Sequence, residues 1–124
     1  MATKTVAILG ASSNRDKFGN KSVRAHLQQG FKVFPVNPRA ETIEGLKCYP
    51  SISEVPGPLD RVSIYLPPAI GLEVIEEVAA CKPNEVWLNP GAESNELIRR
   101  AEELGLHVVV ACSILGVGLS PASL

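Results

Sequence analysis

The stretch VAILGASSNRDKFGNKSV, residues 6–23, decides the fold. It begins in a short apolar, β-branched run that ends at Gly10, as a buried strand of a parallel sheet would. Small and polar residues follow, and apolar residues at helical spacing begin with Val23 and Leu27. Glycine at a strand end lets the backbone turn sharply, and serine hydroxyls and helix N-terminal amides bind phosphate oxygens. The stretch therefore predicts a strand, a phosphate-binding loop and a helix.

Strand-like and helix-like segments alternate along the rest of the chain. Strands are predicted near residues 5–9, 31–36, 61–66, 85–89 and 107–111, and helices over 22–29, 70–81 and 95–104. This alternation predicts an α/β fold: a Rossmann-like three-layer sandwich with a parallel five-stranded sheet, in a single domain spanning residues 1–124. Pro35 removes one ladder donor, which favours a sheet edge for the second strand. Residues 38–60 predict only a short helical turn near 51–55, and no element is assigned to the tail, residues 113–124.

Composition and charge exclude several classes of protein. The 124 residues are 45% apolar and 20% charged, and the formal net charge of −1 argues against a broad nucleic-acid surface. No apolar stretch reaches the ~20 residues of a membrane span and no signal-peptide pattern is present, so we expect a cytosolic protein that binds neither membrane nor nucleic acid. The spacing of the three cysteines and two histidines indicates no metal site. Assembly into a homo-oligomer stays an open alternative.

The end of the second strand narrows the choice of ligand. Ligands of such sheets bind at the carboxyl ends of the strands, which selects the loops at residues 10–19, 37–39, 66–68, 89–93 and from 112 onward. An NAD site usually has Asp or Glu after the second strand, whereas this strand ends in Asn37, Pro38 and Arg39. A guanidinium there suits a ribose with an additional phosphate, as in NADP or coenzyme A. Ser12 stands where the fingerprint G-x-G-x-x-G requires glycine, so the loop departs from the dinucleotide pattern.

Several separated motifs resemble one known family. The string GAS at residues 10–12 is followed by Lys17 and Gly19, then by VFPVNP, EGLKCYPSISEVP and VWLNPG. In this order they resemble the small stand-alone CoA-binding proteins, which are similar to the N-terminal CoA-binding domain of the succinyl-CoA synthetase α subunit. The resemblance covers residues 6–112. It implies a Rossmann-like fold with coenzyme A, or an acyl-CoA, across the strand ends.

The resemblance also implies a set of cofactor-binding residues in three loops. They are Gly10, Ala11, Ser12, Ser13, Lys17 and Gly19 after the first strand, Asn37, Pro38 and Arg39 after the second, and Tyr65, Leu66 and Pro67 after the third. Arg39 stands where the family commonly has a basic residue for the nucleotide phosphate. The segment from Tyr65 matches the Tyr-x-Pro segment that lines the nucleotide in the synthetase.

The sequence contains no recognisable catalytic constellation. A nucleophile needs a base within hydrogen-bond reach, and His107 precedes Cys112 by five residues, which in an extended strand is roughly 16 Å. We therefore expect no catalytic residues, no metal, and non-catalytic binding of coenzyme A or an acyl-CoA. Two alternatives stay open: a minimal NADP-dependent reductase or partner-dependent enzyme subunit, and an interaction module whose cleft stays empty.

Overall fold

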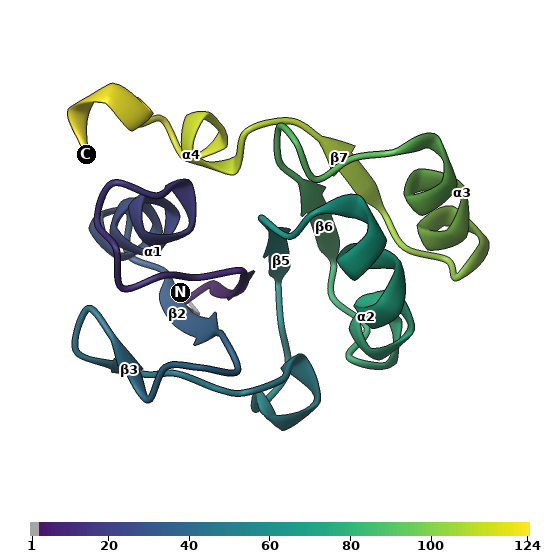
Figure 1. Ribbon diagram of the computed structural model, residues 1–124, viewed down its shortest axis with the longest axis horizontal. Helices are drawn as coiled ribbons and strands as arrows, with labels where there is room; N and C mark the ends of the chain where they lie inside the picture. Colours follow the sequence, from purple (N-terminus) through teal and green to yellow (C-terminus); the bar gives the residue numbers. More distant parts are fainter. Residues whose placement is uncertain (1–2) are drawn as a thin grey trace.

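Five parallel strands form the centre of the computed structural model, which describes residues 3–124. In spatial order the strands are β2 (Lys32–Val36), β1 (Thr5–Leu9), β5 (Arg61–Ile64), β6 (Glu85–Leu88) and β7 (Val108–Val110). Each strand pairs in parallel with its neighbour. All five predicted strands are present, and the predicted α/β, Rossmann-like fold is confirmed (Figure 1).

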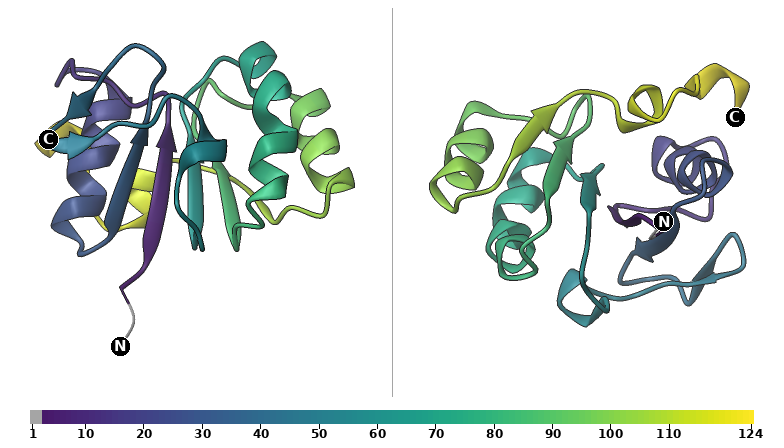
Figure 2. Two further views of the ribbon diagram at one scale, coloured as in Figure 1. Left: turned by 90° about the horizontal axis from the view of Figure 1, so that it is seen from below. Right: turned by 180° about the vertical axis from the view of Figure 1, so that it is seen from behind.

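Helices cover both faces of the sheet and complete three layers (Figures 1 and 2). One face carries α1 (Phe18–Gln28) and the short α4 (Ser113–Gly116), and the other carries α2 (Pro68–Ala80) and α3 (Asn95–Glu103). The observed ends of α2 and α3 each lie within two residues of the predicted ends. Strand β1 is buried on both faces because its side chains alternate between two apolar clusters. That double burial explains its continuous apolar sequence.

The strand order reverses at β1. From β1 the chain forms β2 on one side and later returns to form β5 on the other side of β1. The loops that follow β1 and β5 therefore diverge at the carboxyl edge of the sheet, which is where α/β proteins of this kind bind ligands. Strand β2 is an edge strand, which confirms the placement inferred from Pro35.

Helix α1 begins four residues before its predicted start. Its first residue is Phe18, and Lys17 is its N-cap. Gly19 and Asn20 are weak helix formers, so the sequence pattern gave no signal for this first turn. Hydrogen bonds to other segments fix it instead: the buried Asn20 side chain donates to the carbonyl of Ser12 over 2.9 Å and to Glu44 Oε2 over 3.1 Å.

Two other segments differ from the prediction. Besides the predicted helical turn, η1 (Ile52–Glu54), the residues between β2 and β5 contain a hairpin of β3 (Thr42–Ile43) and β4 (Leu46–Lys47). Strands of two residues are too short to show alternation. The tail, residues 113–124, contains α4 and η2 (Pro121–Ser123) and packs on α1. Lys21 of α1 and Gln29, directly after α1, donate hydrogen bonds to two tail carbonyls, so tertiary contacts rather than helical spacing order the tail.

Candidate functional site

Two glycines let the loop after β1 lie close to Tyr65 and directly against the start of α1. Gly10 has a φ of +86°, and a Cβ there would lie 3.1 Å from the carbonyl carbon of Tyr65. Residues that carry a side chain rarely adopt this left-handed backbone conformation. A Cβ on Gly19 would overlap the carbonyl oxygen of Gly10. The close approach of loop and helix therefore depends on Gly19, and the close approach of the loop to Tyr65 depends on Gly10.

Two asparagine side chains bind the carbonyls of this loop and leave its amides unpaired. Asn37 Nδ2 donates to the carbonyl of Ala11 over 2.8 Å, as Asn20 does to that of Ser12. Within residues 3–124, the backbone amides of Ser12, Ser13 and Gly19 donate no hydrogen bond, whereas those of Asn14 and Asp16 donate to side chains of the same loop. A loop with bound carbonyls and unpaired amides, beside a helix N-terminus, can donate several hydrogen bonds to an anion.

Two basic side chains lie near this loop. Lys17 and Arg39 are both exposed, and neither takes part in the four ion pairs among the described residues. Arg15, by contrast, forms an ion pair with Glu44, in which Arg15 Nε lies 3.6 Å from Glu44 Oε2. The backbone amide of Arg39 donates to Asn37 Oδ1 over 2.8 Å, which fixes the turn after β2. The guanidinium and the Lys17 ammonium are thus available to a negatively charged ligand.

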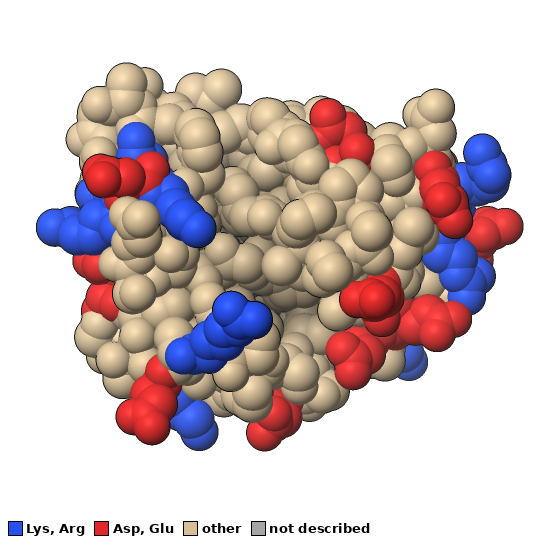
Figure 3. Space-filling model, in the orientation of Figure 1, with Lys and Arg blue, Asp and Glu red and all other residues tan. Residues whose placement is uncertain are grey.

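Two adjoining cavities open at the carboxyl ends of the strands, where Figure 3 shows a hollow with basic side chains beside it. The wide cleft, about 630 Å³, lies between the loop after β1, the start of α1 and the residues after β5 and β6. The apolar pocket, about 290 Å³, lies between the residues after β2, the segment around η1 and the start of α2. Gly10 and Asn37 line both cavities and so mark their boundary.

The structure brings most of the predicted site residues to these two cavities. The wide cleft is lined by Gly10, Ala11, Ser12, Lys17, Gly19, Asn37, Tyr65 and Pro67. The apolar pocket is lined by Gly10, Asn37, Pro38, Arg39 and Leu66. Ser13 is exposed and lines neither cavity. Ligand binding by all twelve residues stays a prediction.

Sequence reasoning missed several residues that shape the cavities. Asp16 and Phe18 line the wide cleft, and Phe18 is 55% exposed there. Residues 90–92 form its wall after β6; the strand-end rule selects their loop, but no motif singled them out. Ile52 and Ile70 line the apolar pocket from η1 and α2, and nothing in the sequence distinguishes them from ordinary core residues.

Tyr65 is a titratable residue that lines the wide cleft. Burial raises the pKa of Tyr65, and a hydrogen bond with Ser113 opposes that rise in part. Neither histidine lines either of these cavities: His26 is a buried residue of α1, and His107 is exposed directly before β7. In the part of the chain that the structure describes, His, Cys, Asp and Glu side chains form no group able to hold a metal ion.

No helix of residues 3–124 has the length and apolar character needed to cross a membrane.

Known proteins are similar to this chain in sequence and in fold. A profile of the CoA binding domain family matches residues 4–117. The ADP-forming acetate–CoA ligase II of Archaeoglobus fulgidus is 45% identical over 78 residues, which cover 61% of this chain. A conserved hypothetical protein of Pyrococcus furiosus has a solved structure with a TM-score of 0.81 and 36% identity, covering 93% of this chain and 99% of that one. The dinucleotide forming acetyl-coenzyme A synthetase 1 of Ca. Korarchaeum cryptofilum, in complex with phosphate and ADP, matches with a TM-score of 0.76 and 33% identity, covering 87% of this chain and 25% of that one.

The relatives differ greatly in length. The chain spans 12% of the Archaeoglobus ligase and 25% of the α subunit of an ADP-forming acetate–CoA ligase II from Pyrococcus furiosus. It spans nearly all of the hypothetical protein from the latter organism. The family match extends over almost the entire sheet and both helical layers, and it confirms the resemblance inferred from the sequence motifs. The chain belongs to the CoA binding domain family.

Proposed function

We propose that this chain binds coenzyme A or an acyl-CoA at the carboxyl ends of the sheet strands and catalyses no reaction by itself. The observation that carries the proposal is the pair of adjoining cavities, with a loop of unpaired amides beside them. Coenzyme A combines a flat adenine, several phosphate groups and a long pantetheine arm. An apolar pocket, an amide-rich loop and a wide cleft suit these three parts in turn, and membership of the family supports the same ligand.

Each part of the ligand has a proposed place. The pyrophosphate would accept hydrogen bonds from the amides of Ser12 and Gly19, with Lys17 close by. The adenosine would occupy the apolar pocket, with its 3′-phosphate beside Arg39. The pantetheine arm would then extend through the wide cleft past Tyr65.

The proposed lack of catalysis follows from the side chains that line the cavities. Their titratable groups are Asp16, Lys17, Arg39, Tyr65 and Glu77. Within the described residues, no two of these side chains form a hydrogen bond or an ion pair with each other. Nucleophilic and acid–base catalysis both rely on such paired groups. A reductase, a partner-dependent enzyme subunit and an interaction module whose cleft stays empty remain the alternatives.

Calorimetry with CoA and NADPH separates the proposal from the reductase alternative. We expect CoA to bind at least about tenfold more tightly, because one additional charge-assisted hydrogen bond is worth about that factor. NADPH carries its extra phosphate on the 2′ oxygen, and the loop has Ser12 at a glycine position of the dinucleotide fingerprint. Equal affinities would show that the site recognises any adenine nucleotide with an added phosphate.

The role of Arg39 can be isolated with dephospho-CoA, which lacks the 3′-phosphate. Arg39→Ala is expected to weaken CoA binding by about 10- to 100-fold and to leave dephospho-CoA binding almost unchanged. Wild-type binding of CoA should also weaken as salt rises, because an exposed ion pair is screened. Titration calorimetry with both ligands measures the effect.

Matched variants make the assignment of the basic residues specific. Arg99→Ala removes the same charge from the exposed side of α3 and should leave CoA binding unchanged. If Lys17→Ala abolishes the preference for CoA and Arg39→Ala does not, the roles of the two residues are reversed. If neither variant changes the preference, the 3′-phosphate does not contact this surface.

A further inference from the structure

A buried polar cluster lies under the wide cleft and joins it to the tail. The hydroxyl of Ser113 lies 2.9 Å from the hydroxyl of Tyr65 and 2.7 Å from that of Ser63. Asn89 Nδ2 donates to Ser63 Oγ over 2.8 Å, and the amide of Ser113 donates to Asn89 Oδ1 over 2.7 Å. Ser63, Asn89 and Ser113 are all completely buried. The cluster therefore links strand β5, the residues that directly follow β5 and β6, and the first residue of α4.

Ser113 is the junction of this cluster. A hydroxyl has one hydrogen to donate and two lone pairs to accept, so Ser113 Oγ can satisfy both Ser63 and Tyr65 at once. Its own backbone amide is bound by Asn89 in addition. Such networks hold their members in one arrangement when every group is satisfied, and no buried side-chain polar atom among the described residues lacks a partner.

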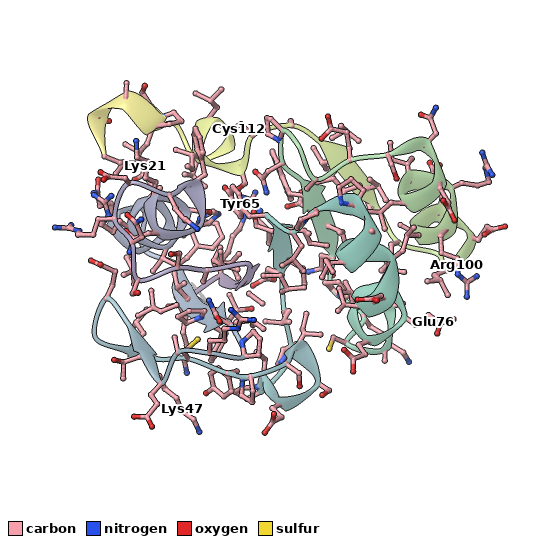
Figure 4. All side chains as sticks on the ribbon, viewed as in Figure 1. Lys21, Lys47, Tyr65, Glu76, Arg100 and Cys112 are labelled. Atoms are coloured by element: carbon pink, nitrogen blue, oxygen red, sulfur yellow. The ribbon has the colours of Figure 1, made fainter. Side chains whose placement is uncertain are left out.

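The cluster contacts two walls of the wide cleft, although Ser113 itself lines neither cavity. Tyr65 forms one wall, and residues 90–92, directly after Asn89, form another. The tail also holds a third wall, because Lys21 of α1 and Gln29, directly after α1, donate hydrogen bonds to the carbonyls of Pro121 and Val117. Figure 4 shows Tyr65 between α1 and the start of α4, close to Cys112.

We propose that Ser113 is a positioning residue: it fixes Tyr65 and the loop after β6, so that docking of the tail and binding of the ligand are coupled. The inference rests on the proposed function, since it concerns the same cleft. Coupling of two equilibria is reciprocal, so a docked tail favours the ligand and a bound ligand favours the docked tail.

A double-mutant cycle on CoA affinity tests this role. Tyr65→Phe and Ser113→Ala remove opposite ends of one hydrogen bond, so each should weaken CoA binding about three- to tenfold. The double variant should bind no more weakly than the weaker of the two single variants, because partners in one interaction are not additive. A merely structural role of Ser113 would instead give independent, additive losses, and that result overturns the inference.

A control in the same tail isolates the effect. Ser123→Ala removes an exposed hydroxyl whose hydrogen bond stays within the tail, to the carbonyl of Ser120, and it should bind CoA like the wild type. If Ser113→Ala also binds like the wild type, the inference fails while the proposed function stands. If the wild type itself does not bind CoA, the proposed function fails, and the inference with it.

Hydrogen exchange on the wild-type protein gives a second test that needs no variant. Adding CoA should slow exchange of the Ser113 amide, which is bound to Asn89 beneath the cleft. The amide of Leu97, bound to Ser94 at the start of α3, serves as the reference and should not change. Slowing at residues 12–19 without slowing at Ser113 would overturn the coupling.

Discussion

Replacing Gly19 with alanine is expected to weaken CoA binding by about 100-fold or more. The added Cβ would overlap the carbonyl oxygen of Gly10, so the loop of residues 10–13 has to move away from α1. That movement displaces the unpaired amide of Ser12 relative to that of Gly19 at the helix N-terminus, so the two amides can no longer donate to one pyrophosphate. Loss of two charge-assisted hydrogen bonds corresponds to about 3 kcal/mol, and each 1.4 kcal/mol is about tenfold in affinity.

The stability of this variant should fall as well, because the displaced loop includes Ala11, which is buried in the core. Alanine is a better helix former than glycine by about 1 kcal/mol, which offsets part of the strain in the first turn of α1. Gly30→Ala is the matched control: Gly30 has a φ of +85°, so alanine is strained there, but the position is open and lines neither cavity. It should lose stability and retain affinity. Near-normal CoA binding by Gly19→Ala would contradict the proposed anion site.

Lowering the pH from 6.5 to 4 is expected to reduce the free energy of unfolding by about 3 kcal/mol through His26 alone. Burial, with a smaller contribution from the Arg61 guanidinium, lowers the pKa of His26 from 6.5 to about 4, and a hydrogen bond with the Ser22 carbonyl opposes the shift in part. Between pH 6.5 and pH 4 the unfolded chain therefore binds a proton that the folded chain does not. The free energy of unfolding then falls as pH falls, by about 1.4 kcal/mol for each pH unit.

Denaturant unfolding, followed by the fluorescence of Trp87 across this pH range, measures the effect. His26→Gln should be less stable than the wild type near neutral pH and should lose much of the pH dependence between pH 6.5 and pH 4. His107→Gln replaces the exposed histidine and should keep the wild-type dependence. Equal pH dependence in all three proteins would show that His26 takes up a proton in the folded state.

The fold was predictable because its signals are local and repeated. Buried parallel strands are continuous apolar runs, and helices such as α3 carry apolar residues at regular spacing and a capping serine, Ser94. The first turn of α1 and the tail were not predictable in this way. Asn20 is held by contacts with distant segments, as is Ser113, and neither residue differs in local pattern from a surface polar residue.

The candidate site was predictable where glycine and strand ends mark it. Gly10 and Gly19 point to a close backbone approach, and the rule of carboxyl strand ends selects the loops around both cavities. The apolar walls were not predictable, because Ile52 and Ile70 resemble core residues until the cavity is seen. The buried cluster around Asn89 was missed for the same reason: its partners are distant in sequence.

Amide spectra of isotope-labelled protein, recorded during titration with CoA, test the central claim most directly. The account predicts that the largest shifts occur at the amides of Ser12, Ser13 and Gly19, which are unpaired in the structure, with further shifts at Tyr65 and Arg39. Amides of α3, which lies away from both cavities, should remain unchanged. An unchanged spectrum at saturating CoA, or shifts that are largest outside the loop of residues 10–19, would contradict CoA binding at this site.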